Sequence, residues 1–174
     1  MEISVDPETT RQPPPDAFHI RPAAATDVPV ILALIRELAE YEKLLHEVVA
    51  TEALVKTALF GPEPVAQCAL ACVHSDPVGF ALYFHNYSTF KGRAGLYLED
   101  LFVRPEHRGH GIGEALLRYL ARSRGGARLS AHGVGRPQLE QARDRVLHER
   151  VGAVGVLDWT VFRVSGEALA RLGS

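Results

Sequence analysis

Apolar residues along the chain cluster in runs of strand length, separated by polar or glycine-containing turns. Seven runs predict strands, at residues 18–21, 65–73, 77–84, 95–103, 127–131, 154–156 and 159–164. The turn His74–Asp76 joins the second run to the third, and residues 86–93 join the third to the fourth. Connections this short join neighbouring antiparallel strands, so these three runs predict an antiparallel meander.

Other stretches repeat their apolar residues with helical spacing. Thr26–Asp27 and Thr51 provide capping residues for two of these stretches, and Gly125–Gly126 stops a third. Four predicted helices end near Tyr41, Phe60, Arg124 and Leu172, and a partial apolar stripe predicts a further helix within residues 136–150. The pattern therefore predicts an α+β fold with a mixed, mostly antiparallel central sheet flanked by helices.

The composition is typical of a globular protein: 174 residues, of which 47% are hydrophobic and 23% charged. Residues 1–16 are polar and contain Pro13–Pro15, so we expect a disordered leader there and a single domain over 17–174. A net charge of −2 gives no general attraction to nucleic acid, and no apolar run is long enough to cross a membrane.

Cys68 and Cys72 lie in one apolar run, where a strand would place them on the same face but too far apart to bridge easily. They are interpreted as small buried hydrophobic residues. The polar, acidic N-terminus does not fit a signal peptide, so a cytoplasmic protein is expected. No spacing typical of metal ligands is present, and we expect no metal.

The stretch Gly95–Leu120 combines a strand, a basic glycine-rich turn and a helix. The strand carries Glu99 and Asp100, and it ends before Pro105 because proline cannot donate to the ladder. The turn Arg108–Gly113 contains three glycines and leads into the helix. The first N–H groups of a helix attract anions, glycines let the backbone approach a phosphate, and arginine adds charge. This order predicts an anion site.

An ordinary strand-to-helix turn is the alternative, because such turns also use glycine for their geometry. The coincidence of an arginine, three glycines and nearby carboxylates favours anion binding. A Walker loop would need Gly-Lys-Ser/Thr, which is absent, and the Rossmann pattern G-x-G-x-x-G with a later acidic partner fits poorly.

The spacing Arg-x-x-Gly-x-Gly, after Leu-Glu-Asp-Leu-Phe-Val, resembles motif A of the GNAT superfamily of N-acetyltransferases. The likeness is greatest to the spermidine/spermine and thialysine branch, covers about Phe18 to Arg128 and resumes near Gly152. It implies acetyl-CoA as co-substrate and a small primary amine, such as a thialysine-like amino acid or a polyamine, as acceptor. A homodimer is also implied.

The same resemblance implies a cofactor site. The turn would bind the pyrophosphate of CoA, and strand N–H groups freed by a bulge would stabilise the thioester oxygen. The implied residues are Leu101, Phe102, Val103, Arg108, Gly109, His110, Gly111, Ile112, Gly113 and Glu114.

For the amine, the resemblance implies contacts with Tyr41, Glu42 and Glu99, whereas a solvated connector is the alternative for the first two. Lys43 dilutes the negative potential and argues against a dedicated spermine site. An amine of pKa about 10.4 costs roughly 4–5 kcal/mol to deprotonate at pH 7, so a general base is useful. Glu99 is the candidate base, and we expect it to be partly buried; a strand carboxylate that points to solvent is the alternative. Alternation places Asp100 on the opposite face, in a structural role.

The segment 131–150 departs from the family pattern, and only Gly152–Ala153 agrees again. His148 stands where the family has the tyrosine that protonates the thiolate, which makes it a candidate acid; a surface or structural histidine is the alternative. Codons exist for Val134–Glu149 that, read one nucleotide over, give WVDLNWSKPATAFYTS, which is close to the family pattern. We therefore hypothesise paired frameshifts, which resequencing of the gene would test.

Two other functions compete with an acetyl-CoA-dependent amine N-acetyltransferase. A CoA-binding domain with weak or no catalysis is one, because the segment 131–150 is altered while motif A is whole. A purely structural α+β subunit is the other, and it leaves the turn at Arg108 unexplained.

Overall fold

The computed structural model describes residues 18–123, 129–131, 167, 171 and 172. It divides the chain into two units, residues 1–141 and 142–174, and the site discussed below lies in the first. The predicted leader, the strands predicted at 154–156 and 159–164, and His148 lie outside the described residues.

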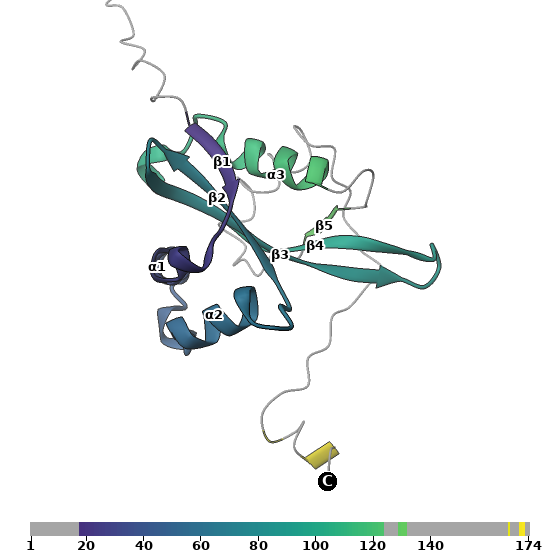
Figure 1. The fold of residues 1–174 in the computed structure, drawn as a ribbon. Coiled ribbons are helices and arrows are strands. Elements are labelled where there is room, and N and C mark those ends of the chain that lie inside the picture. The colour runs from purple at the N-terminus through teal and green to yellow at the C-terminus, as the bar shows by residue number, and fades with distance from the viewer. Residues whose placement is uncertain (1–17, 124–128, 132–166, 168–170, 173–174) are drawn as a thin grey trace, which may run out of the picture. The chain divides into compact units, whose positions relative to one another are not determined.

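The first unit contains a five-stranded sheet in the order β1-β2-β3-β4-β5 (Figure 1). Strands β1 to β4 pair antiparallel, and β5 pairs parallel with β4 after the crossover through α3. The predicted mixed, mostly antiparallel sheet of an α+β fold is therefore confirmed. The strands are β1 Phe18–Pro22, β2 Gln67–Val73, β3 Asp76–Ser88, β4 Arg93–Val103 and β5 Leu129–Ala131.

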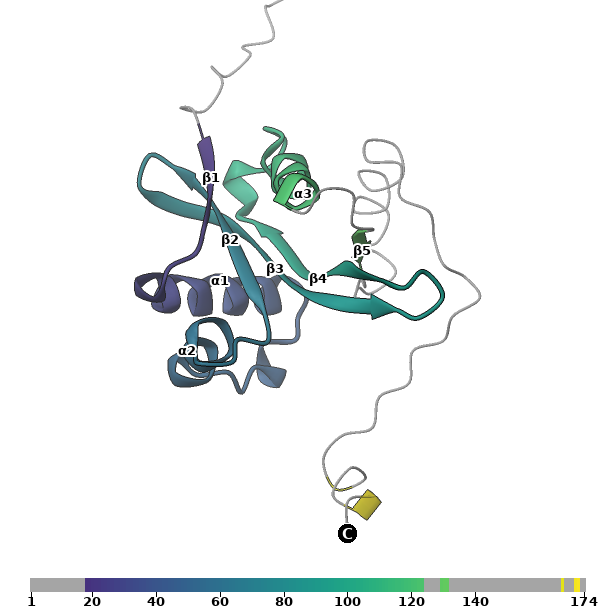
Figure 2. The ribbon, with the colours of Figure 1, turned by 45° about the vertical axis from the view of Figure 1, so that its right-hand side comes forward.

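Helices cover both faces of this sheet (Figure 2). On one face, α1 (Val28–Tyr41) and α2 (Glu52–Phe60) pack over alternate residues of the central strands. The other face carries α3 (Ile112–Ser123), which packs against β1 to β4. Strand β2 serves both layers: Cys68, Leu70 and Cys72 join the first core, while the small residues Ala69 and Ala71 between them are also fully buried. Both cysteines are buried and unpaired, as predicted.

The predicted ends of the first two helices agree with the structure, and α3 is described as far as Ser123, while the helix predicted to end near Leu172 lies mostly outside the described residues. The role of Asp27 differs from the prediction. Thr51 caps α2, since its hydroxyl accepts the Leu54 N–H at 3.3 Å. Asp27 precedes α1 but makes no such cap. Its carboxylate instead accepts two bonds from Arg21, at 2.6 and 2.8 Å, and the Ala24 N–H at 2.7 Å. This acid therefore ties β1 to the start of α1.

Strands β3 and β4 form a hairpin longer than predicted, which extends past the rest of the sheet (Figure 1). Within it, Tyr83 pairs with Leu98 but the preceding Leu82 pairs with Asp100. Glu99 is therefore an extra residue on β4, the mark of a β-bulge. The family resemblance implied that a bulge frees the N–H groups of Leu101–Val103, and the structure places a bulge at Glu99, just before those residues.

Candidate functional site

The turn between β4 and α3 has the geometry of an anion cradle. After the short 3-10 segment η3 (Pro105–His107), Gly109 and Gly111 both have φ of +82°, a conformation that favours glycine. The Gly111 carbonyl accepts the Ala115 N–H at 2.9 Å and so starts the helix. The N–H groups of Ile112 and Gly113 lie in the first turn of α3, where no helical carbonyl can reach them. They lie at the positive end of the helix dipole.

Space above this turn is open. Apart from the neighbouring backbone of the turn and helix, a Cβ built on Gly109, Gly111 or Gly113 would meet no atom of the described residues within 4 Å. Ile112, by contrast, is 1% exposed, so its side chain belongs to the core and only its backbone serves the turn. A group that needs close approach to backbone N–H donors therefore fits here, and a phosphate is such a group.

The side chains of His110 and Glu114 have local partners. His110 is exposed, with Nδ1 3.4 Å from the His107 carbonyl oxygen. Glu114 accepts two bonds from Arg118 one helical turn on, at 2.9 and 2.8 Å. Any contribution of Glu114 to an anion site would therefore come from its backbone.

Arg108 is held beside the turn by two contacts. Its Nε donates to the Val103 carbonyl at 2.8 Å, and its guanidinium lies 4.2 Å from the centre of the Tyr41 ring. The Phe102 ring lies 5.6 Å away. In the part of the chain that the structure describes, the two terminal nitrogens of Arg108 have no hydrogen-bond partner. They remain available to a ligand, in the bidentate form that suits phosphate.

The end of β4 offers backbone donors along one edge. Strand β5 pairs only with Leu96–Leu98, so past the bulge this edge of β4 has no strand partner among the described residues. The Arg104 N–H donates to the Val78 carbonyl on β3. Backbone N–H groups alternate in direction along a strand, so the Phe102 N–H points toward β3 as well. The backbone N–H groups of Leu101 and Val103 therefore point toward the open edge of β4. Two of the three N–H groups predicted to bind the cofactor are thus placed for it.

The structure contradicts one prediction about the acidic pair on β4 and removes the basis of another. Glu99 is exposed, not partly buried, because the bulge takes it out of the paired ladder. The alternation used to place Asp100 on the opposite face does not hold across a bulge. Asp100 is half-buried.

The two residues predicted to contact the amine end helix α1. Tyr41 is 42% exposed, and the Glu42 N–H closes the helix on the Leu38 carbonyl at 3.0 Å. The structure brings Tyr41 to Arg108, although 67 residues separate them. In the described part of the chain, no hydrogen bond or ion pair joins Glu99 to either residue.

An ion pair that sequence reasoning missed supports the same turn. Arg104 donates to Glu37 through Nε and a terminal nitrogen, both at 2.9 Å, and lies 3.7 Å from Asp76. The hydrogen bond to Glu37 raises the pKa of Arg104 above its ordinary value. The sequence patterns that contain these residues gave no sign of the pairing, because only the fold brings α1 to the end of β4.

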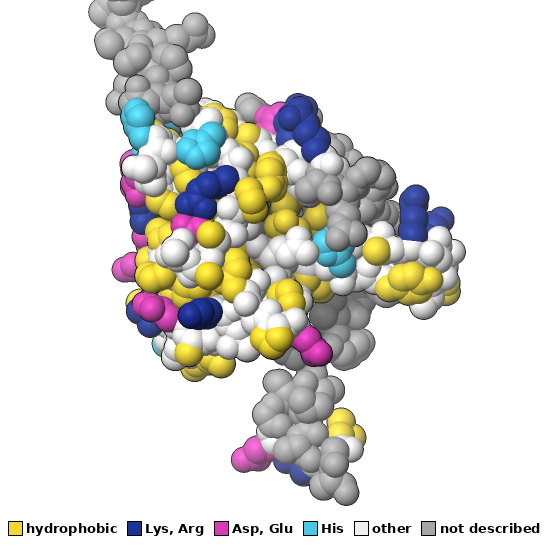
Figure 3. Space-filling view, viewed as in Figure 1, with side chains coloured by type: hydrophobic (Ala, Val, Ile, Leu, Met, Phe, Trp, Pro, Cys, Tyr) yellow, Lys and Arg dark blue, Asp and Glu magenta, His cyan; other side chains and the backbone are white. Residues whose placement is uncertain are grey.

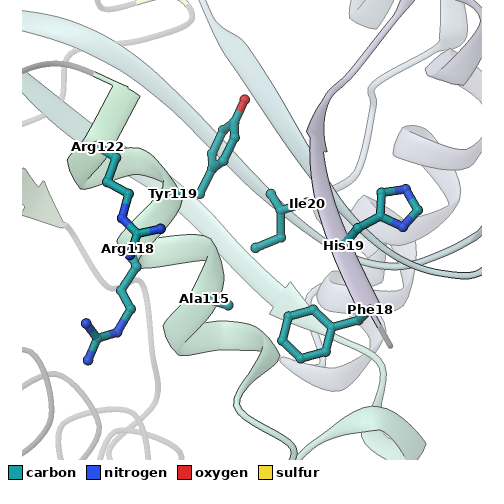
Figure 4. A pocket seen from close by; sticks show the side chains of 7 residues that line it. All are labelled: Phe18, His19, Ile20, Ala115, Arg118, Tyr119 and Arg122. Atoms are coloured by element: carbon teal, nitrogen blue, oxygen red, sulfur yellow. The ribbon is translucent and has the colours of Figure 1, made fainter. Parts of the chain in front are cut away.

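One hollow of about 240 Å³ lies elsewhere, between β1 and α3. In Figure 4, Phe18 and Ile20 project toward the helix, which contributes Ala115, Arg118, Tyr119 and Arg122. None of the predicted site residues lines this hollow. The candidate site is instead the surface formed by the turn, Arg108 and the open edge of β4.

On the face drawn in Figure 3, the charged side chains do not form one extended patch of a single sign. Among the described residues, no helix is long and apolar enough to span a bilayer. No group of three or more His, Cys, Asp or Glu side chains suited to a metal ion occurs in the same part.

Comparison with known proteins identifies the family. Residues 33–153 match the model of the acetyltransferase (GNAT) family. The chain is 38% identical to a Bos taurus thialysine N-epsilon-acetyltransferase, over 88% of this chain and 95% of that protein. It is 39% identical to a Homo sapiens spermidine/spermine N(1)-acetyltransferase-like protein 1, over 64% of this chain and 17% of that one.

The fold also has solved counterparts. An integron cassette protein from the mobile metagenome of V. cholerae superposes with a TM-score of 0.71 at 23% identity, covering 90% of this chain and 97% of that one. Together with a turn shaped for an anion at the start of α3, the match to the family model and the identity to full-length relatives lead to one conclusion. The chain belongs to the GNAT acetyltransferase family and is an N-acetyltransferase.

Proposed function

We propose that the protein transfers the acetyl group of acetyl-CoA to a primary amine of a small molecule, either a thialysine-like amino acid or a polyamine. The observation that carries the cofactor assignment is Arg108, held beside an open helix N-terminus with its terminal nitrogens available. The names of the similar proteins support the acceptor class. Because these similar proteins are named as acetyltransferases, the alternative of a CoA-binding domain without catalysis is not favoured.

For the cofactor, the proposal assigns the pyrophosphate to Arg108 and the backbone of Gly109–Glu114. The N–H groups of Leu101 and Val103, on the open edge of β4, bind the pantetheine arm and the thioester oxygen. That oxygen gains negative charge in the tetrahedral intermediate, and fixed N–H donors stabilise it.

For the amine, the proposal assigns Tyr41 and Glu42 as contacts and Glu99 as the general base. Because Glu99 is exposed, a water between its carboxylate and the ammonium group can carry the proton. The neutral amine then attacks the thioester carbon and the CoA thiolate leaves. A thiol of pKa about 8.5 is a good leaving group even without an acid, and His148 is the proposed proton donor.

We also propose a single catalytic domain over 17–174, in the cytoplasm, that works as a homodimer. The two unpaired cysteines fit a reducing compartment. Tyr87 and Phe90, 66% and 91% exposed, lie at the tip of the β3–β4 hairpin, where apolar side chains gather in Figure 3. Exposed aromatic residues of this kind are typical of contact surfaces.

Release of CoA thiol from acetyl-CoA tests the acceptor class, with thialysine, lysine, ornithine, spermidine and an aminoglycoside each supplied separately. We expect release with an aliphatic small amine and identify the product by mass spectrometry. Release that does not depend on any of these amines would contradict the proposed acceptor class.

A further inference from the structure

Helix α1 contacts the chain on both sides of η3, the segment that leads into the anion turn. Glu37 and Tyr41 are four residues apart and so lie one above the other on one face of the helix. Glu37 binds Arg104, and Tyr41 lies against Arg108. These two arginines stand on either side of η3, four residues apart as well. One face of α1 thus fixes the start and the end of the segment that leads into the anion turn.

The contact with Tyr41 leaves Arg108 ready to bind an anion. An arginine has five N–H donors, and here the Nε donor is used by the Val103 carbonyl while the central carbon of the guanidinium lies over the Tyr41 ring. A ring contact restrains the guanidinium without using a hydrogen-bond donor. An ion pair in the same place would have consumed the terminal nitrogens and neutralised the charge that a phosphate needs.

The exposure of Tyr41 shows that its ring is not needed for the core. The side chain is 42% exposed and is not among the buried residues that join α1 to the sheet, such as Leu34 and Leu38. Removing the ring therefore leaves the hydrophobic core intact, and its effect can be measured on the site.

We propose that Tyr41 is a positioning residue for acetyl-CoA: its ring holds the Arg108 guanidinium beside the turn so that the terminal nitrogens can take the pyrophosphate. This rests on the proposed cofactor site. The amine role that the family resemblance implies for Tyr41 does not require the ring to affect CoA binding when no amine is present. The positioning role, in contrast, requires that loss of the ring weakens CoA binding even without amine.

Calorimetric titration with CoA, without amine, tests the proposal on Tyr41→Leu, Tyr41→Phe, Arg108→Ala and the Tyr41→Leu/Arg108→Ala double variant. Loss of a cation–π contact at an exposed site should weaken CoA binding roughly two- to fivefold in Tyr41→Leu. Tyr41→Phe keeps an aromatic face and should bind CoA as the wild type does. In the Arg108→Ala background, Tyr41→Leu should cause no further loss, because the contact acts only through Arg108.

Steady-state kinetics supply a second readout. Tyr41→Leu should raise KM for acetyl-CoA, measured at saturating amine, because positioning affects binding of the cofactor, and Tyr41→Phe should restore this KM. Thermal unfolding of each variant checks that the fold is retained.

Wild-type CoA affinity in Tyr41→Leu, or an equal loss with and without Arg108, would overturn the positioning role and leave the cofactor site standing. Wild-type CoA affinity in Arg108→Ala would instead overturn the proposed pyrophosphate site itself. The two failures are therefore distinguishable within one set of titrations.

Discussion

At the scale of single residues, the bulge in β4 determines what Glu99 can do. An extra residue in a strand escapes the pairing that would turn its side chain into the apolar layer, and Glu99 is accordingly exposed. A solvated carboxylate beside the open edge of β4 can relay a proton through water. Its value as a base then depends on how much of the amine is still protonated.

Glu99→Gln should therefore lower turnover most where the amine is mostly charged. At pH 7 we expect a loss of about a hundredfold, in the range usual for a general base. Near pH 9.5, closer to an amine pKa of about 10.4, the loss should be smaller because more amine is already neutral. The pH profiles of kcat/KM for wild type and variant make the comparison. An equal loss at both pH values would count against Glu99 as the base.

At the scale of elements, two ion pairs fasten helix α1. Asp27 accepts two hydrogen bonds from Arg21 that join the start of the helix to β1, and Glu37 fastens its last turns to Arg104. The hydrogen bonds from Arg21 hold the pKa of Asp27 below its ordinary value. A lowered pKa in the folded state means that the ionised carboxylate stabilises the fold.

Asp27→Asn should lower the free energy of unfolding by about 1–2 kcal/mol at pH 7, allowing for the partial exposure of Arg21. The contribution of Asp27 is complete above the unfolded-state pKa of about 3.9 and is lost as pH falls through the lower folded-state pKa. Urea unfolding of both proteins across this pH range measures it. The gap between them should narrow in acid, and a gap independent of pH would show that the charge is not responsible.

Local sequence patterns determine much of this fold, and prediction failed where a feature depends on contacts between residues far apart in the chain. Strand runs, the Thr51 cap and the glycine turn are written in neighbouring residues, so the order of elements and the anion turn could be predicted. The bulge at Glu99 could not, because it depends on the register between two strands. The contact of Tyr41 with Arg108 depends on how α1 packs under the sheet, and no local spacing reports that.

At the scale of the whole molecule, the segment that departs from the family pattern limits the expected activity. Gly133 and Gly135 replace apolar strand residues, and glycine leaves nothing to pack. The family's tyrosine is replaced by His148. We expect these changes to weaken catalysis without abolishing it, because a thiolate can leave without an acid.

Replacing Val134–Glu149 by WVDLNWSKPATAFYTS should therefore raise both acetyl-CoA affinity and turnover. Calorimetry and the thiol-release assay compare the two proteins, with circular dichroism as a check on folding. If the protein with the replaced segment shows neither higher acetyl-CoA affinity nor higher turnover, the present segment is a working variant. The interpretation of this segment as damage would then be refuted.

The proposed homodimer can be tested at the hairpin tip. Phe90→Ser, at a side chain 91% exposed, should leave the fold of each subunit intact and weaken self-association. Light scattering after size exclusion gives the mass in solution. A wild-type protein that is monomeric at assay concentrations would rule out the proposed dimer.

Acetyl-CoA binding at the N-terminus of α3 is tested most directly by Gly113→Val. Gly113 has no left-handed φ, and beyond its own backbone neighbours its Cβ would meet no atom of the described residues within 4 Å. The stiff valine side chain therefore fits this part of the protein but occupies the anion cradle. Valine is also no worse than glycine in a helix, so stability should not fall. We measure KM for acetyl-CoA in the thiol-release assay, together with the melting temperature. The expected result is a KM raised about ten- to a hundredfold, equivalent to one lost charge-assisted contact, in a protein that melts no lower than the wild type. An unchanged KM for acetyl-CoA in a well-folded Gly113→Val protein would contradict the assignment.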